Sequence, residues 1–428
     1  METYREPARD LEICADVDVL VAGGGPAGVA AALTAARRGA STLLVEQLGD
    51  LGGISTSGLM SHWTGGVTSA LYEEVLRRSA GRNEGAWKDV ITPTIDPEHL
   101  KTLYLDLMEE AGVRVRLYTF VSGVVRQGAD ITGLIVESKS GRQVIRARVV
   151  VDATGDGDVA ARAGVPFTLG REGDGKMQPA TIMFKVGGVD ESRAVFPGSF
   201  ETTVDTPRGE LQALARAHLP FPAGHVLLYR TTHPGVVTCN MTNCIDVDGT
   251  RAEDLTQATV LCRRQMEHIV AFLREYAPGY EQCFALSSAA LVGIRETRHF
   301  QGLYTLNEQD ILDARRFDDW VVRDARFNFD VHNLTGAGLD ETGAQKHFPQ
   351  SKGYTIPYRC LVPVGVGGLL LAGRNISGTH LAHSNYRVMP ICLALGEAAG
   401  IAAALAVAEG VPVDKVDATR IQQELLRS

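Results

Sequence analysis

The sequence predicts an α/β fold with a central parallel sheet, into which a second, mixed α+β lobe is inserted. An apolar strand at residues 17–22 runs into Gly23-Gly-Gly25-Pro-Ala-Gly28 and a helix of small residues. Two more apolar strands, 147–151 and 368–372, also end in glycine-containing turns. Between residues 166 and 355 Gly, Pro, Phe and His become more prominent, and short β-like stretches dominate. We therefore expect the N-terminal and C-terminal parts of the chain to build the central sheet together, and the part between them to build the second lobe.

The individual elements follow from apolar periodicity and from turn residues. In chain order, we expect a helix at 27–36, a strand at 41–45, a helix at 97–112, strands within 113–125, 131–137 and 143–152, and a helix at 255–276. A last long helix spans 388–409, with Pro390 in its first turn and Gly410 as its stop. The predicted domain boundaries are 15–165 and 356–428 for the two parts of the first domain, and 166–355 for the inserted one.

Composition excludes some partners. Lys and Arg number 42 and Asp and Glu 51, so the net charge of −9 gives no general attraction to nucleic acid or to an anionic membrane. The apolar run at 388–408 is interrupted by Gly396, Glu397 and Gly400, which favours a packed core helix over a membrane span. Because the N-terminus has no apolar signal region, a cytoplasmic location is expected. The seven scattered cysteines form no Cys-x-x-Cys pair and predict free thiols.

The first glycine turn predicts a dinucleotide site. Gly23 permits a tight turn, Gly25 lets the backbone approach a pyrophosphate, and Gly28 lets the helix pack on the strand. The helix N-terminus offers free N–H groups and the positive end of its dipole to phosphates. Glu46 ends the second strand, 18 residues after Gly28, where a carboxylate accepts hydrogen bonds from ribose hydroxyls.

A second turn, Asp152-Ala153-Thr154-Gly155-Asp156, follows the strand at 147–151. The carboxyl ends of strands are where α/β sheets bind ligands. Taken alone, this turn is equally consistent with an ordinary loop between a strand and a helix.

Three distant segments together resemble FAD-dependent oxidoreductases of the glutathione-reductase-like class: the first turn with Glu46, the turn at 153–157, and Leu371-Ala-Gly373-Arg374. Residues 51–56, 293–298, 356–359, 372–380 and 387–400 narrow the resemblance to the bacterial FAD-dependent oxidoreductase family related to fumarate reductase and succinate dehydrogenase flavoproteins. The resemblance covers most of residues 15–410. It implies a Rossmann-like FAD-binding domain, an inserted substrate domain and one bound FAD.

The resemblance also implies which residues contact the FAD. They are Gly23, Gly25, Pro26, Ala27, Gly28, Glu46, Gly52, Gly53, Thr56, Val121, Ala153, Thr154, Gly155, Asp156, Gly373, Arg374, Met389 and Pro390. The N-terminus of the last helix would face the pyrimidine edge of the flavin and stabilise negative charge there. The chain has no second Gly-x-Gly-x-x-Gly, so a dedicated NAD(P)H domain is not expected. The electron acceptor stays open among O2, a quinone, another protein and a second substrate.

His332 is the candidate catalytic base. It lies two residues after Asp330, so both side chains share a face if the segment is extended. A neutral imidazole suits proton abstraction near pH 7, and the carboxylate would orient the ring. The alternative is a polar loop histidine without a catalytic role.

Arginines are the candidate substrate-holding residues. Arg298, Arg359 and Arg387 lie in or beside the family-like segments, and several arginines near one flavin favour an anionic substrate. In the run Arg295-Glu-Thr-Arg298, one arginine would pair with Glu296 and leave the other for the substrate. The alternative is salt bridging between the lobes.

Two further histidine assignments follow. His380 would donate a hydrogen bond at the flavin site. His380 and His383 have i, i+3 spacing, but no third ligand with recognised spacing accompanies them, so no metal is expected. His62 follows the glycine loop at 51–56 and is a weaker candidate for covalent attachment of the flavin.

We therefore expect an FAD-dependent dehydrogenase or oxidase that takes a hydride from a small polar organic molecule. Two alternatives stay open, a flavin-dependent monooxygenase and a non-catalytic flavin-binding module. The expected partners are a small-molecule substrate and an unidentified electron acceptor, without nucleic acid or membrane. A homo-oligomer is left open.

Overall fold

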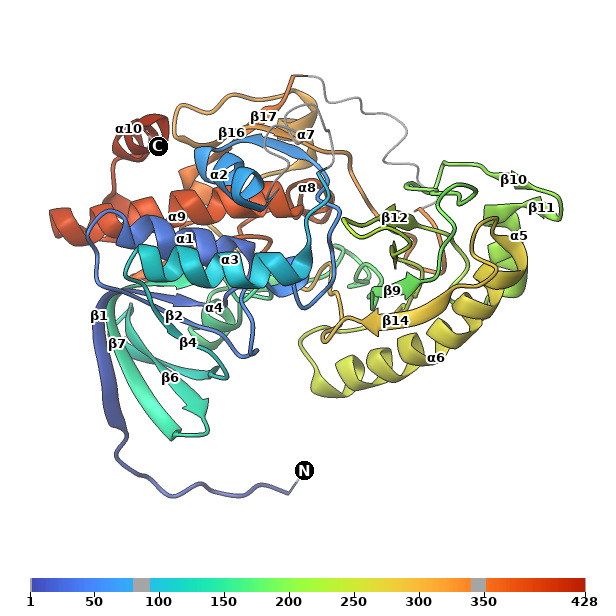
Figure 1. Ribbon diagram of the computed structural model, residues 1–428. Helices are drawn as coiled ribbons and strands as arrows, with labels where there is room; N and C mark the ends of the chain where they lie inside the picture. The colour runs from blue at the N-terminus through green and yellow to red at the C-terminus, as the bar shows by residue number, and fades with distance from the viewer. Residues whose placement is uncertain (1, 80–92, 340–351, 428) are drawn as a thin grey trace.

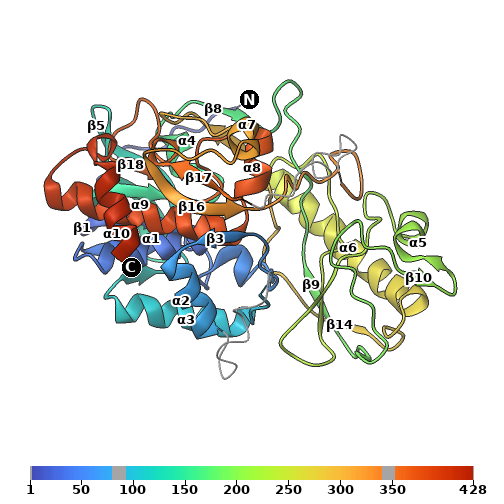
Figure 2. The same cartoon turned by 90° about the horizontal axis from the view of Figure 1, so that it is seen from above.

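The computed structural model describes residues 2–79, 93–339 and 352–427, which form two lobes side by side (Figures 1 and 2). The larger lobe contains the N-terminal and C-terminal parts of the chain. The smaller lobe is built from the middle of the chain and carries the long helix α6 (Ala252–Tyr276) on its outside. The predicted α/β class with an inserted second lobe is confirmed.

A seven-stranded sheet forms the centre of the larger lobe, in the order β4-β2-β1-β7-β6-β5, with β18 also paired to β7. Its strands are β1 (Glu12–Ala22), β2 (Thr42–Val45), β4 (Arg114–Arg116), β5 (Phe120–Gln127), β6 (Asp130–Ser138), β7 (Gly141–Asp152) and β18 (Leu369–Leu371). The pairs β1–β2, β1–β7, β2–β4 and β7–β18 are parallel. The C-terminal strand therefore lies beside a strand that is more than two hundred positions earlier in the sequence.

Two apolar helices, α1 (Pro26–Ala36) and α9 (Met389–Glu409), run closely side by side over this sheet (Figure 1). A Cβ on Gly396 would lie 2.0 Å from the carbonyl oxygen of Ala27, so only glycine allows the backbones to approach this far. The Thr34 hydroxyl donates to the carbonyl oxygen of Glu397 at 3.1 Å across the contact. Most of α1 therefore packs directly against the middle of α9.

Helix α9 has the length and apolar composition of a membrane span, but 89% of its most apolar window is buried in the protein. Gly410 ends it in a left-handed conformation with φ 68°, as the sequence predicts. The expectation of a packed core helix is confirmed.

The smaller lobe holds a four-stranded antiparallel sheet in the order β12-β13-β9-β14. The strands and helices of the smaller lobe are, in chain order, β9 (Phe184–Gly187), β10 (Asp205–Thr206), β11 (Gly209–Glu210), α5 (Leu211–His218), β12 (Leu228–Arg230), β13 (Val237–Cys239), α6 and β14 (Phe284–Ser288). A separate apolar core, drawn from residues 184–283, lies between this sheet and the two helices.

The remaining elements surround the larger lobe. They are β3 (Gly66–Thr68), α2 (Ala70–Ser79), α3 (Pro97–Glu110), α4 (Asp158–Arg162), β8 (Phe167–Leu169), β15 (Arg298–Phe300), α7 (Glu308–Leu312), β16 (Trp320–Arg326), β17 (Tyr354–Pro357), α8 (His380–Tyr386) and α10 (Ala418–Arg427). Buried residues from Phe300 to Phe329 belong to the core of the larger lobe. The predicted boundaries at 165 and 355 stay predictions, while this packing indicates that the chain returns to the larger lobe near residue 298.

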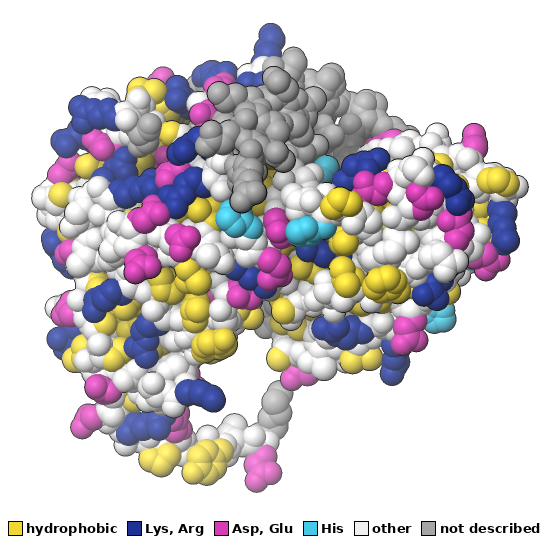
Figure 3. All heavy atoms as spheres, in the orientation of Figure 1, with side chains coloured by type: hydrophobic (Ala, Val, Ile, Leu, Met, Phe, Trp, Pro, Cys, Tyr) yellow, Lys and Arg dark blue, Asp and Glu magenta, His cyan; other side chains and the backbone are white. Residues whose placement is uncertain are grey.

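Acidic and basic side chains are interspersed on the face shown in Figure 3, without a broad area of one sign. This distribution agrees with the modest net charge of −9.

Candidate active site

A cavity of about 680 Å³ lies where the two lobes meet, at the carboxyl ends of β1 and β7. The larger lobe contributes the glycine turn and the N-termini of α1 and α9, and the smaller lobe contributes side chains such as Met183, Tyr229 and Asn240. The cavity has the size of a site for a cofactor or an organic ligand. It also lies at the sheet edge where α/β folds bind ligands.

The first glycine turn fits a dinucleotide such as the expected FAD. A Cβ on Gly28 would lie 1.8 Å from the carbonyl oxygen of Gly23, so this glycine serves the close packing of α1 on the turn. A Cβ on Gly25 would instead meet no described protein atom within 4 Å, and Gly25 lines the cavity. Gly25 is therefore needed for something other than protein packing, which suits a backbone that approaches a pyrophosphate.

The N-termini of α1 and α9 both open on the cavity through Pro26 and Met389. Within the described chain, no side chain caps either helix at its N-cap residue, Gly25 or Val388, and neither has an acidic residue in its first turn. The free N–H groups and the positive dipole ends are left for an anionic ligand.

Glu46 and Arg374 supply the polar contacts at this end of the cavity. Glu46 is buried and accepts hydrogen bonds from the backbone N–H of Gly24 at 2.6 Å and of Leu48 at 2.8 Å. Arg374 Nη2 donates to Asp156 Oδ1 at 2.5 Å. Its buried Nε has no hydrogen-bond partner in the described parts of the chain, as expected for a donor that serves a phosphate oxygen.

Most of the predicted FAD contacts line the cavity. These are Gly23, Gly25, Pro26, Ala27, Glu46, Gly53, Val121, Ala153, Thr154, Gly155, Asp156, Gly373, Arg374 and Met389. Gly28, Gly52, Thr56 and Pro390 are not among the lining residues and shape the surrounding loops and helix starts. The backbone N–H of Gly52 donates to the carbonyl oxygen of Gly24 at 2.7 Å, and the Thr56 hydroxyl donates to the carbonyl oxygen of Leu51 at 2.6 Å.

The other part of the cavity holds a charged cluster of Arg295, Asp330, His332 and Arg387. Asp330 Oδ2 lies 2.9 Å from Arg387 Nη2 and 3.5 Å from His332 Nε2. The ring of Phe200 meets the His332 ring edge-on, with centroids 5.1 Å apart. The predicted Asp330–His332 pairing is present, and both residues face the space that a substrate would occupy.

Burial and the neighbouring charges set the protonation of this cluster. Burial, followed by the nearby Arg295 charge, lowers the pKa of His332 to about 4. Burial raises the pKa of Asp330, but His332, Arg387 and Arg295 outweigh it and hold that pKa below its usual range. At neutral pH the cluster therefore holds a neutral imidazole, one carboxylate and two guanidinium groups.

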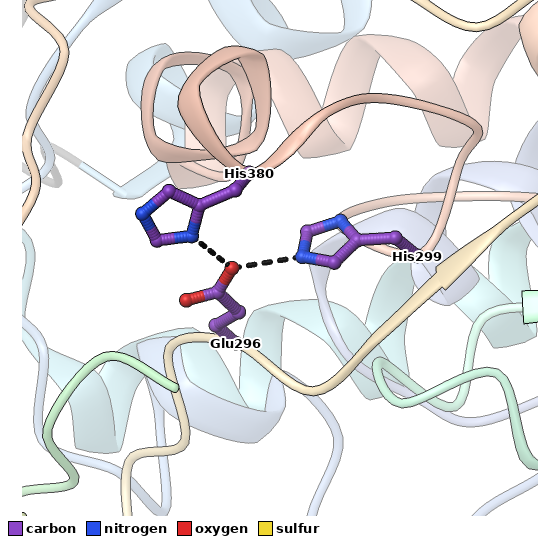
Figure 4. Close-up of side chains that lie close together, drawn as sticks. All are labelled: Glu296, His299 and His380. Atoms are coloured by element: carbon purple, nitrogen blue, oxygen red, sulfur yellow. Dashed lines mark hydrogen bonds and ion pairs between the residues drawn. The ribbon is translucent and has the colours of Figure 1, made fainter. Parts of the chain in front are cut away.

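Three of the predicted catalytic residues lie elsewhere. Arg298 Nη1 pairs with Asp158 at 2.9 Å, and Arg359 Nε pairs with Asp319 at 2.8 Å; neither arginine lines the cavity. His380 also lies outside the lining, with Nδ1 2.5 Å from Glu296 Oε1 (Figure 4). The assignment of these three residues to direct substrate or flavin contact is therefore corrected.

Arg295 is the site residue that the final sequence assignment missed. Gly293 pairs with Thr181 at the cavity wall, which holds the next residues at the cavity, whereas β15 carries Arg298 away to pair with β8. Glu296 pairs with two histidines and with neither arginine of the motif. The motif is visible in the sequence, but the choice between its two arginines depends on strand pairing, which residue spacing does not indicate.

His62 stacks on Tyr229, with ring centroids 4.5 Å apart and an angle of 3° between the rings. Tyr229 lines the cavity but His62 does not. His62 therefore supports the position of Tyr229 in the cavity wall. A covalent link between His62 and the flavin stays a prediction.

Comparison with known proteins places this site in a family. Residues 18–425 match the family of FAD dependent oxidoreductases. The thiamine thiazole synthase of Methanococcus vannielii is 27% identical over 195 residues, which cover 43% of this chain and 74% of that protein. The narrower relation to fumarate reductase and succinate dehydrogenase stays a prediction.

Two solved structures show more distant similarity. A geranylgeranyl bacteriochlorophyll reductase-like protein from Thermoplasma acidophilum is 15% identical with a TM-score of 0.49, covering 96% of this chain and 83% of that one. An anhydrotetracycline hydroxylase from Streptomyces rimosus is 12% identical with a TM-score of 0.49, covering 95% and 65%. Because the family match spans nearly the whole chain, the protein belongs to the FAD dependent oxidoreductase family and is an enzyme that uses FAD.

Proposed function

We propose that this enzyme is a dehydrogenase or oxidase that takes a hydride from a small organic substrate carrying a carboxylate. Bound FAD supplies the two-electron acceptor, which is the chemistry of the family. The substrate would lie between the FAD end of the cavity and the charged cluster of Arg295, Asp330, His332 and Arg387.

The observation that carries the proposal is an excess of positive charge with unused donors. Arg295 and Arg387 contribute two positive charges, Asp330 one negative charge, and His332 none at neutral pH. Among the described residues, Arg387 Nε and Gln178 Nε2 are buried and have no hydrogen-bond partner. Buried donors without partners are costly, so an acceptor-rich, anionic group fits this position.

His332 is suited to the proton transfer that accompanies the hydride. The neutral imidazole would accept the proton of a substrate hydroxyl or amine, and bound FAD would supply the acceptor for the hydride of the adjacent C–H bond, so that the substrate would be oxidised by two electrons. Asp330 orients the ring and stabilises the imidazolium that forms, because its oxygen lies 3.5 Å from His332 Nε2.

Anaerobic reduction of the flavin tests the substrate class, measured as loss of its visible absorbance with hydroxy acids, amino acids and their uncharged esters. Replacement of Arg387 by Met is expected to raise KM for the reactive acid by roughly 10- to 100-fold, because a hydrogen bond between charged groups is lost. Arg359→Met is the matched control, because Arg359 pairs with Asp319 outside the cavity. Equal effects of the two substitutions would contradict the assignment of Arg387.

The same experiment separates the alternatives. Rapid reduction by NADPH, followed by an oxygenated product in air, would indicate a flavin monooxygenase instead. A flavin that no small metabolite or nicotinamide reduces would indicate a non-catalytic flavin-binding module. Reduction by the ester as readily as by the acid would overturn the carboxylate part of the proposal.

The pH dependence gives a further expected outcome. Because His332 must be neutral to accept a proton and its pKa is lowered to about 4, kcat/KM should stay level from pH 8 to about pH 5 and fall below that. Initial rates in buffers of constant ionic strength measure the profile. An acidic limb near the ordinary histidine pKa of about 6.5 that persists in His332→Gln would show that another group titrates, and one that disappears would show that the pKa of His332 is not lowered.

A further inference from the structure

A second buried cluster, Glu296, His299 and His380, is formed by residues that do not line the cavity (Figure 4). Glu296 has no exposed surface, and His299 and His380 are each 7% exposed. Glu296 lies just before β15, His299 lies within it, and His380 begins α8. The three residues play no direct part in the proposed hydride transfer.

Both imidazole rings direct a nitrogen at the same carboxylate oxygen. Glu296 Oε1 lies 2.8 Å from His299 Nε2 and 2.5 Å from His380 Nδ1, as the dashed lines in Figure 4 show. These three atoms lie within 4.8 Å of one another. Two nitrogens and one oxygen from separate parts of the fold thus converge on one small buried volume.

Hydrogen bonding on the far side of His299 fixes the orientation of its ring. His299 Nδ1 lies 3.1 Å from the carbonyl oxygen of Gly378, which only accepts hydrogen bonds, so Nδ1 carries the hydrogen. In a neutral ring, Nε2 then presents a lone pair to Glu296 Oε1, which also presents lone pairs when ionised. A proton or a metal ion between the two atoms would satisfy both lone pairs, and Nε2 is directed at Glu296 in either case.

The surroundings resemble the outer contacts of protein metal sites. Histidine ligands commonly donate their other ring N–H to a backbone carbonyl, and ligating carboxylates are themselves hydrogen-bonded. Here Gly378 accepts from His299, and the backbone N–H of Gln178 donates to Glu296 Oε2 at 3.0 Å. The first contact orients His299 and leaves its Nε2 directed at the cluster. The second holds Glu296 through Oε2 and leaves Oε1 directed at the cluster.

His383 is the second, independent observation. It is 2% exposed, and its ring meets the His299 ring edge-on with centroids 5.1 Å apart. Its buried Nδ1 has no hydrogen-bond partner within the described ranges. This nitrogen lies in a ring packed against His299, but it is not among the ligand atoms that converge within 4.8 Å of one another.

We propose that Glu296, His299 and His380 bind a divalent first-row transition metal ion. Two imidazoles and one carboxylate match the nitrogen and oxygen preferences of zinc and of ferrous iron. Ligand atoms on one such ion are roughly 3.0–3.4 Å apart, given metal–ligand distances of about 2.1 Å. The Glu296 carboxylate therefore withdraws by about half an ångström to admit the ion. This reverses the expectation of no metal, because the fold supplies the third ligand that His380 and His383 lack in the sequence.

The ion would tie α8 to β15 and hold Glu296 against Gln178. The Gln178 side chain in turn lies 3.4 Å from Arg387 Nη2 in the cavity. The proposal does not depend on the proposed function, since metal content is measured without turnover.

Metal analysis of untagged protein from medium supplemented with zinc, iron and manganese tests the proposal. Wild type is expected to hold about one equivalent of metal per chain, and His299→Gln and His380→Gln less than about one fifth of that. His233→Gln is the matched control, because His233 is exposed and pairs with Asp96 on the surface. After chelation, added Zn²⁺ should raise the unfolding midpoint of wild type and of the control by roughly 2 °C or more, and leave that of His380→Gln unchanged.

Two results would overturn the proposal. One is wild-type protein with under about a tenth of an equivalent of metal and an unfolding midpoint that Zn²⁺, Fe²⁺ and Mn²⁺ do not change, which would show that the cluster binds none of these ions. The other is equal metal content in wild type and both histidine variants, which would place the metal elsewhere. The wild-type measurements decide the question even if a variant does not fold.

Discussion

Replacement of Gly25 by valine is expected to abolish FAD binding and to leave the fold of the apoprotein intact. The Cβ of the new side chain would meet no described protein atom within 4 Å, and Gly25 has φ −67°, which any residue adopts. The valine would occupy the position where a pyrophosphate approaches the backbone and the N-terminus of α1. Visible flavin absorbance after purification and reconstitution measures the loss, and circular dichroism of the apoprotein measures the fold.

Gly28→Ala is the informative comparison. Its Cβ would lie 1.8 Å from the carbonyl oxygen of Gly23, so α1 must move away from the turn. Overpacking of this kind typically costs about 1–3 kcal/mol of stability, so the unfolding midpoint of this apoprotein should fall. A Gly25→Val protein that retains FAD with wild-type affinity would show that the cofactor does not use this turn.

Replacement of His332 by glutamine is expected to reduce kcat by roughly 10²-fold or more, because the group that accepts the proton is removed while a polar side chain of similar size remains. FAD content should be unchanged, since His332 lies with Asp330 and Arg387 rather than at the glycine turn. Single-turnover reduction of the flavin under anaerobic conditions measures the effect on the chemical step. Added imidazole should restore part of the rate if a base is missing.

His225→Gln controls for packing around the base. The rings of His225 and His332 both meet the Phe200 ring edge-on at 5.1 Å, but His225 does not line the cavity. A similar loss of rate in both variants would assign the effect to the packing of Phe200. Near-normal turnover of His332→Gln would remove the base role from His332.

The FAD-binding half of the fold was predictable because its signals are local. A buried strand, a glycine turn and a small-residue helix are adjacent in the sequence, and Glu46 follows at the end of the next strand. The Asp330–His332 pair was predictable because the two residues are only two positions apart, although tight backbone turns at 328–331, and not a strand, bring their side chains together.

The choice among the arginines was not predictable from spacing. Arg295 reaches the cavity because Gly293 pairs with Thr181, and Arg298 leaves it because β15 pairs with β8. Both pairings join residues that are more than a hundred positions apart. Arg359 lies in a short helical turn opposite Asp319, a contact that no local pattern indicates. The pairing of Glu296 with His380 likewise depends on how the last part of the chain packs.

The close packing of α1 against α9 has a consequence for biosynthesis. The chain emerges from the ribosome with the glycine turn first, yet the second helix N-terminus and strand β18 belong to its final segment. Gly396 and Gly400 can settle against the Ala27 and Ala31 carbonyls only after nearly the whole polypeptide is available. A nascent chain that ends before residue 368 would therefore lack the N-terminus of α9, which is one of the two helix N-termini that open on the cavity. FAD capture becomes a late event, which couples the cofactor to completion of the full-length protein.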